Sequence, residues 1–205
     1  VLVGKLIPDS GSVMYDGQSV LGRKPLEINQ MGISRVFQTP EIFSDLSVFE
    51  NVMIPCFAKR DGAFRMHAIE SIFAERGIQE QAEAILDDVN MLEKKDMIAS
   101  SLSRGDKRRL EMAMCLVQDP KLLLLDEPTA GMARADTQNT IALLKEIREK
   151  RGITMAIIEH DMNVVFSLAE RITVLAQGTP LVEDTPDNIK GHPKVREAYL
   201  GEAQV

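Results

Sequence analysis

Unbroken apolar runs mark the strands that this chain predicts. Residues 122–125 are four consecutive leucines, and residues 153–158 form a second run rich in β-branched side chains. Runs without polar alternation favour central strands of a parallel sheet that is covered on both faces. The residues between them, about 134–151, have a helical pattern, so this segment predicts a right-handed βαβ unit. With a further strand at residues 33–37, we expect an α/β fold.

A hairpin and a helical segment complete the pattern. Asp16-Gly17 stands between two short β-prone runs, and an Asp-Gly pair is a strong signal for a two-residue hairpin turn. From residue 48 to about residue 117 the pattern turns helical. We therefore expect a helical lobe in this part of the chain.

The composition narrows the functions open to the chain. A formal net charge of −7 argues against a nucleic-acid-binding surface. No apolar run approaches the ~18 residues that suggest a membrane-spanning helix. Cys56 and Cys115 lie far apart among apolar residues, so we expect buried, reduced thiols and no disulfide between them. The three histidines are scattered and predict no metal cluster.

Two adjacent carboxylates follow the leucine run. Asp126 and Glu127 come directly after it, and ligands of parallel sheets bind at the carboxyl ends of the strands. In phosphoryl-transfer enzymes of the P-loop class, a carboxylate at this place holds Mg²⁺ and a neighbour orients or deprotonates the attacking water. The alternative is an ordinary buried strand that ends in a solvated acidic turn.

A predicted helix start gives a second candidate site. Ser103 is a favourable N-cap, and Asp106 three residues later completes a capping box. The unpaired N–H groups and the positive dipole end of such a helix can bind a phosphate, although a plain capped surface helix is the alternative.

One histidine stands at a comparable position. His160 lies 33 residues after Glu127, where the next predicted strand gives way to a helix. Two neighbouring parallel strands would bring His160 to the same sheet edge as Asp126 and Glu127. A lone histidine at such a place is otherwise structural.

Together these motifs resemble the nucleotide-binding subunit of an ATP-binding cassette (ABC) transporter. Gln38 matches the family's Q-loop, residues 102–106 its signature motif, residues 122–127 its Walker B motif and His160 its H-loop, in the family's order. The resemblance covers essentially the whole chain. It implies a P-loop NTPase-type, RecA-like fold with a mostly parallel sheet, helices on both faces and a small antiparallel β part. The expected domains are a core lobe at residues 1–47 and 119–205 and an inserted helical subdomain at residues 48–118.

The resemblance also implies roles for the motif residues. Two subunits would sandwich two ATP molecules with Mg²⁺. Glu127 is the expected general base, Asp126 a Mg²⁺ ligand, and Gln38 a contact of both Mg²⁺ and the attacking water, while His160 would hold the γ-phosphate. Contacts with the nucleotide are also expected from the signature motif and the D-loop, at Ser103, Arg104, Gly105, Asp106, Gly131 and Met132.

Two motifs depart from the commonest family pattern. The signature motif reads Leu-Ser-Arg-Gly-Asp, where Leu-Ser-Gly-Gly-Gln is usual. Arg104 could add a cation near the phosphate, but its Cβ removes some backbone freedom. The D-loop has Ala133 where many relatives carry Asp or Asn.

The sequence contains no Gly-x-x-x-x-Gly-Lys-Ser/Thr motif, which the resembled fold needs to grip the phosphates. Gly4-Lys5 does not substitute for it, because Leu6 and Ile7 follow and supply no hydroxyl for Mg²⁺. We expect the sequence to begin inside the helix after the P-loop of a longer protein, and to be inactive alone. A natural relative without a P-loop is the alternative.

Short segments resemble particular subfamilies. Residues 191–202 resemble the closing segment of branched-chain amino acid uptake ATPases, whereas residues 37–40 with Phe43, and residues 130–137, look closest to the urea-uptake branch. The lipopolysaccharide-export ATPase has a similar Tyr-Leu-Gly-Glu ending. The expected function is therefore the ATP-hydrolysing motor of an importer for branched-chain amino acids or urea, with lipopolysaccharide export as a further option.

The expected partners follow from the same resemblance. They are a second ABC ATPase subunit, identical or not, transmembrane permease subunits and, indirectly, a periplasmic substrate-binding protein, with no nucleic acid. The protein would be peripheral, on the cytoplasmic face of the inner membrane. Six apolar residues could line the permease groove or belong to the core: Ile42, Phe43, Leu46, Val48, Phe49 and Val52.

Two other classes of ABC protein fit less well. A soluble ABC ATPase of DNA repair or chromosome maintenance normally carries a long coiled coil or a zinc insertion between its motifs. The 65 residues from Gln38 to Ser103 contain neither. A non-catalytic regulatory subunit would be expected to lose Glu127 or His160, and both are present.

Overall fold

The computed structural model describes residues 1–61 and 76–197. The chain forms two compact units, Val1–Ile158 and Glu159–Val205. Predictions for residues 62–75 of the helical segment, and for the end of the closing segment from residue 198, lie outside the described residues. Within the described ranges, no helix is both long and apolar enough to cross a bilayer.

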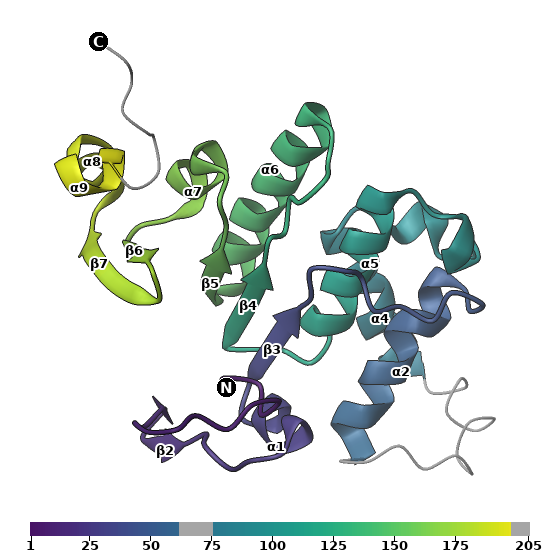
Figure 1. Ribbon diagram of the computed structural model, residues 1–205. Helices are drawn as coiled ribbons and strands as arrows, with labels where there is room; N and C mark the ends of the chain where they lie inside the picture. The colour runs from purple at the N-terminus through teal and green to yellow at the C-terminus, as the bar shows by residue number, and fades with distance from the viewer. Residues whose placement is uncertain (62–75, 198–205) are drawn as a thin grey trace. The chain divides into compact units, whose positions relative to one another are not determined.

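A three-stranded parallel sheet runs through the first unit (Figure 1). In sheet order its strands are β3 (Ile33–Val36), β4 (Leu122–Asp126) and β5 (Thr154–Ile158). Leu123 and Leu125 are at most 1% exposed, and the alternate leucines Leu122 and Leu124 pack on a cluster of Val20, Ile28 and Ile33. The leucine run is continuous because both faces of β4 carry apolar contacts.

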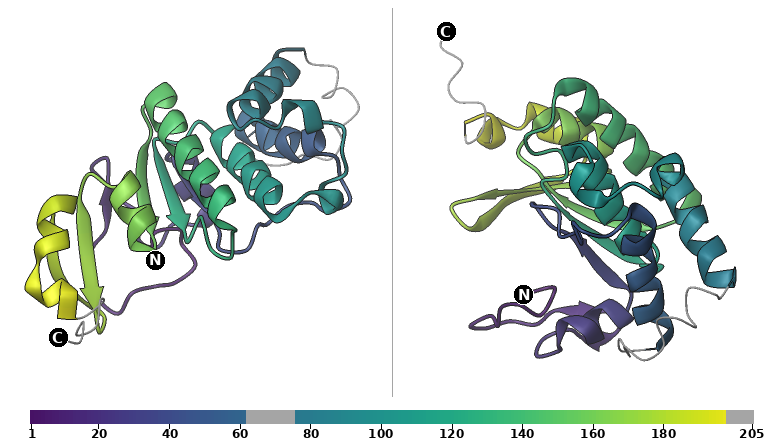
Figure 2. Two further views of the ribbon diagram at one scale, coloured as in Figure 1. Left: turned by 90° about the horizontal axis from the view of Figure 1, so that it is seen from above. Right: turned by 90° about the vertical axis from the view of Figure 1, so that its right-hand side faces the viewer.

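Helix α6 (Arg134–Arg151) joins β4 to β5 and has the predicted bounds. Figures 1 and 2 show it alongside these two strands. Its buried side chains recur every three or four residues, at Ile141, Leu144 and Ile147. Gly152 ends the helix with a left-handed φ of 61°. The predicted strand, helix and parallel strand are confirmed.

The predicted hairpin is also present. Strand β1 (Met14–Tyr15) pairs antiparallel with β2 (Gln18–Ser19). Asp16 and Gly17 between them have φ values of 48° and 75°, the positive values of the primed hairpin turn that an Asp-Gly pair favours. Helix α1 (Pro25–Gln30) follows and packs against β3.

Helices dominate the described part of residues 48–118, as predicted. Three of them pack on one another: α2 (Val48–Asp61), α4 (Arg76–Asp88) and α5 (Arg104–Leu116). Two short 3-10 helices, η2 (Leu92–Lys94) and η3 (Ala99–Ser101), lie between α4 and α5. The division into a core lobe and a helical subdomain stays a prediction.

The second unit has its own small core. Helix α7 (Met162–Leu168) precedes the antiparallel strands β6 (Ile172–Ala176) and β7 (Thr179–Asp184), and the helices α8 (Pro186–Gly191) and α9 (Pro193–Val195) follow. Its buried apolar cluster consists of Ile172, Val174, Ile189 and Val195. This unit and the hairpin supply the antiparallel β parts that the fold class predicted.

Both cysteines are free, as predicted. Burial raises the pKa of Cys56 to about 11 and that of Cys115, whose sulfur donates to the Arg35 carbonyl oxygen, to about 12. Since the thiolate is the reactive form, we expect Cys56 to react with iodoacetamide at pH 8 on the order of 100-fold more slowly in the folded protein than in denaturant, and Cys115 on the order of 1,000-fold more slowly. Mass spectrometry of each cysteine measures this, and equal rates in the two states would contradict it.

Candidate functional site

The turn after β4 carries the acidic pair. Asp126 is the last residue of β4 and lies opposite Ile158 of β5, whose carbonyl oxygen accepts the Glu127 N–H over 2.9 Å. Glu127 then has a left-handed φ of 46°. A non-glycine residue adopts this conformation only when its surroundings hold it there. The two carboxylates therefore stand on a constrained turn at the carboxyl edge of the sheet.

Gln38 reaches the same turn. It lies two residues after β3, and its Nε2 donates to Oε2 of Glu127 over 2.7 Å, although 89 positions separate the two residues. The contact forms because β3 and β4 are parallel neighbours, so their carboxyl ends lie at one edge. Two of the predicted site residues are thus in direct contact.

Arg35 is a site residue that the sequence did not reveal. Its Nη2 lies 2.5 Å from Oδ2 of Asp126. The guanidinium carbon is 5.0 Å from the centroid of the Phe37 ring, and Nζ of Lys5 is 4.4 Å from the same centroid. The only signal in the sequence was an arginine within a short predicted strand. That signal does not identify a site residue until the strand order shows that the arginine lies next to Asp126.

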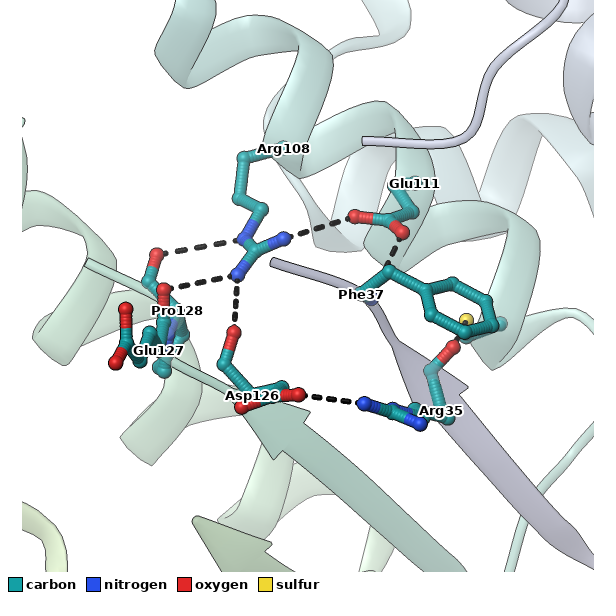
Figure 3. A network of polar contacts seen from close by, with 8 residues as sticks. Arg35, Phe37, Arg108, Glu111, Asp126, Glu127 and Pro128 are labelled. Atoms are coloured by element: carbon teal, nitrogen blue, oxygen red, sulfur yellow. Dashed lines mark hydrogen bonds and ion pairs between the residues drawn. The ribbon is translucent and has the colours of Figure 1, made fainter. Parts of the chain in front are cut away.

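A buried arginine on α5 also binds the acidic turn (Figure 3). Arg108 donates from Nη2 to the carbonyl oxygens of Asp126 and Glu127, over 2.9 and 3.0 Å. Its Nη1 donates to Glu111 over 3.1 Å, and Glu111 accepts the Phe37 N–H over 2.9 Å. Burial lowers the pKa of Arg108 and raises the pKa of Glu111, and the attraction between the two charges opposes both shifts.

The N-cap that Ser103 was predicted to form at the start of α5 is confirmed, but the Asp106 carboxylate accepts the Ser103 hydroxyl and not its N–H, so the predicted capping box is only half formed. Ser103 Oγ accepts the Asp106 N–H over 3.1 Å and donates to the Asp106 carboxylate over 2.8 Å, while Lys94 lies 2.7 Å from that carboxylate. Burial alone would raise the pKa of Asp106, but the hydrogen bonds from Lys94 and Ser103 outweigh it and keep this pKa below its usual value. A polar hollow here is lined by Lys94, Ser103, Gly105, Asp106, Arg109, Asp136 and Thr140.

The D-loop lies against the start of the same helix. Gly131 has a left-handed φ of 67°, and a β-carbon there would lie 2.6 Å from Nη1 of Arg104. The backbone conformation therefore favours glycine, and a β-carbon would also displace the end of the flexible Arg104 side chain. The sulfur of Met132 accepts a hydrogen bond from the Thr140 hydroxyl over 3.4 Å. The signature motif and the D-loop of the same chain are therefore in contact through Arg104.

Most of the first unit matches one protein family. Residues 1–130 match the family described as ABC transporter. The chain belongs to the ABC transporter family. Residues 181–205 match the family described as branched-chain amino acid ATP-binding cassette transporter. The resemblance and fold class predicted from the motifs are confirmed, and this ABC protein is an ABC-type ATPase subunit.

Individual relatives agree over nearly the whole length of the ABC protein. It is 35% identical over 207 residues to the high-affinity branched-chain amino acid transport ATP-binding protein BraF of Pseudomonas aeruginosa, across 98% of this chain and 80% of BraF. The ADP conformation of MJ1267, an ATP-binding cassette of an ABC transporter, superposes with a TM-score of 0.80 at 29% identity, across 98% and 81% of the two chains. A dimeric post-hydrolysis state of the cassette MJ0796, bound to ADP and Pi, gives 0.71 at 25% identity, across 88% and 75%.

His160 of the ABC protein belongs to the second unit. It lies between β5 and α7, as predicted, and Asp161 beside it caps α7 by accepting the Asn163 N–H over 2.8 Å. The His160 N–H donates to the Glu159 carboxylate over 3.1 Å, and the imidazole is 72% exposed. Its role in hydrolysis stays a prediction.

The apolar residues after the Q-loop divide between core and surface. Val48 and Val52 are fully buried, whereas Phe43 is 48% exposed. The half-buried members are Ile42, Leu46 and Phe49. Buried Asn51 holds this loop, because its side chain accepts the Phe43 N–H over 2.8 Å and donates to the Phe43 carbonyl oxygen over 3.0 Å. Val48 and Val52 are therefore core residues, and Phe43 is an exposed aromatic side chain held in place.

Proposed function

We propose that this chain is the ATP-hydrolysing motor subunit of an importer for branched-chain amino acids. The observation that carries the proposal is the hydrogen bond between Gln38 and Glu127 beside Asp126, which joins the Q-loop to the Walker B carboxylates. The solute is supported by BraF and by the family that matches residues 181–205, both of which are named for branched-chain amino acids. Neither name mentions urea or lipopolysaccharide, the other solutes that the sequence suggested.

Glu127 acts as the general base in this proposal. Its carboxylate accepts a proton from the water that attacks the γ-phosphorus of ATP, while the bond from that phosphorus to the β,γ-bridging oxygen breaks and ADP leaves. Gln38, already bound to that carboxylate, orients the same water and helps to exclude other positions for it. His160 donates a hydrogen bond to the γ-phosphate.

Asp126 and Gln38 suit a bound Mg²⁺. This ion binds proteins through one or two oxygen ligands and completes its shell with waters and phosphate oxygens. In the described ranges, no group of three His, Cys, Asp or Glu residues forms a closed metal site, and Mg²⁺ needs none. A bound Mg²⁺ would neutralise charge on the β- and γ-phosphates. Arg35 competes with such an ion for the Asp126 carboxylate.

A second ABC ATPase subunit completes the site. The dimeric state of MJ0796 supports this arrangement. Ser103, Arg104, Gly105 and Asp106 would bind the nucleotide held by the partner, at the N-terminal end of α5 where unpaired amides favour a phosphate. For the Ser103 hydroxyl to donate to that phosphate, its hydrogen bond to the Asp106 carboxylate has to break. Gly131 and Met132 would contribute from the D-loop.

Permease subunits and location follow from the importer role. Exposed Phe43, held by Asn51, is an apolar contact suited to a permease segment. The ABC protein would then be peripheral, on the cytoplasmic face of the inner membrane. A periplasmic substrate-binding protein would act on it only through the permease.

Solute uptake by the intact complex, with its permease and binding protein in lipid vesicles, tests the proposal. We expect ATP-dependent uptake of labelled leucine and no uptake of urea, together with faster ATP hydrolysis when leucine-loaded binding protein is present. The same complex carrying Glu127→Gln is the control for uptake without hydrolysis. Uptake of urea alone would contradict the solute, and leucine uptake without ATP would contradict the motor.

A further inference from the structure

Arg108 holds the backbone of the turn on which both carboxylates stand. Besides its bonds to the Asp126 and Glu127 carbonyl oxygens, its Nε donates to the Pro128 carbonyl oxygen over 3.4 Å (Figure 3). These three carbonyl groups flank the left-handed φ of Glu127. A planar guanidinium can donate to several oxygens in fixed directions, which an ammonium cannot do. The arginine therefore fixes a turn that would otherwise relax.

Glu111 connects the same arginine to the Q-loop. It lies one turn further along α5, accepts from Arg108 through Oε2 and accepts the Phe37 N–H through Oε1. Phe37 precedes Gln38, whose side chain binds Glu127. A closed ring of contacts thus runs from α5 to the acidic turn, on to the Q-loop and back to α5.

The attraction between the two charges does not by itself explain this ion pair. Both side chains are only 4% exposed, and removing two charges from water is costly enough that apolar residues of similar volume are often as stable. Apolar residues could not, however, bind the four backbone groups that this pair binds, which are the carbonyls of residues 126–128 and the amide of Phe37. Those four groups surround the general base and the Q-loop.

We propose that Arg108 and Glu111 are positioning residues for ATP hydrolysis, which hold Glu127 and Gln38 in the mutual geometry that the attacking water requires. This inference rests on the proposed role of Glu127 as the base. It also connects the two ends of the site. Ser103 lies five residues before Arg108, about 7.5 Å along the helix axis, so a movement of the signature end reaches the Glu127 turn through one rigid helix.

The variants Arg108→Lys and Glu111→Gln test the inference in the intact complex. The matched controls are Arg151→Lys and Asp88→Asn, which make the same changes in an ion pair between α6 and α4, at the far end of α6 from the D-loop. We expect each test variant to lower kcat about 10- to 100-fold, as small misplacements of reacting groups do, with KM for ATP within about 3-fold. We expect the controls to keep kcat within about 2-fold, as substitutions distant from the reacting groups do.

A second measurement separates positioning from a general structural role. If Arg108 acts through Glu127, then adding Arg108→Lys to Glu127→Gln should lower the residual rate by less than about 2-fold. Equal losses in both backgrounds would overturn the inference, because Arg108 would then act independently of the base. Melting temperatures identify a variant that fails to fold. If Arg108→Lys fails in this way, Glu111→Gln is the test variant, because it keeps the side-chain volume and an acceptor oxygen for the Phe37 N–H.

The outcomes also separate this inference from the proposed function. Normal kcat in Arg108→Lys and Glu111→Gln, with Glu127→Gln inactive, overturns the positioning role and leaves Glu127 as the base. Normal turnover by Glu127→Gln alone overturns the proposed base, and the positioning role falls with it.

Discussion

Replacement of Glu127 by Gln is expected to slow ATP hydrolysis by the intact complex about 100- to 10,000-fold, the usual contribution of a positioned general base. The amide has the same shape and can still accept the hydrogen bond that Gln38 donates, but it cannot take a proton from the attacking water. ATP binding should change by less than about 3-fold, because binding and proton removal are separate steps. Phosphate release under saturating ATP and equilibrium binding of labelled ATP measure the two effects.

A surface glutamate provides the control for this change. Glu146 lies on α6 in an exposed pair with Lys150, with a side chain 47% exposed, and Glu146→Gln should leave hydrolysis unchanged. Near-normal turnover by Glu127→Gln would refute its role as the base. In that case the contact with Gln38 would be structural.

The second large effect is expected at His160. Its exposed imidazole lies two residues after β5, and we propose that it donates a hydrogen bond to the γ-phosphate. Removing one donor to a group that develops charge in the transition state typically costs about 100- to 1,000-fold in rate. We therefore expect His160→Ala to impair hydrolysis and leucine uptake together.

His192 is the matched control for His160 among the described residues. It lies between α8 and α9, where its Nδ1 is buried without a hydrogen-bond partner. His192→Ala should leave the hydrolysis rate within about 2-fold, since distant sites act independently. Equal losses at both positions would return His160 to a structural role.

Much of the local structure could be predicted, because its signals lie within a few residues of each other. The Ser103 cap and the Asp16-Gly17 turn each depend on side-chain and backbone preferences over four residues. The bounds of α6 follow from its periodic apolar positions and the left-handed Gly152. The order of four motifs predicted the family, which the match of residues 1–130 confirmed.

The contacts that build the site could not be predicted in the same way. In the sequence Arg108 lies in a run of three basic residues, 107–109, and such runs usually face solvent. In the folded chain it is 4% exposed and binds a turn about twenty positions away. Arg35 and Asp126, 91 positions apart, pair only because β3 and β4 are neighbours.

The sequence by itself determined the βαβ unit, the first hairpin, the Ser103 cap, the family and the residue types at the Walker B and Q-loop positions, because caps, turns and apolar periods act over short distances along the chain. Only the tertiary structure decided which side chains meet: Gln38 with Glu127, Arg35 with Asp126, and Arg108 with the acidic turn. The left-handed backbone conformation of Glu127 was likewise decided only by the tertiary structure. The physical reason is that strand order and the rotation of α5 are set by packing over the whole unit, and burial then decides which charges must find partners.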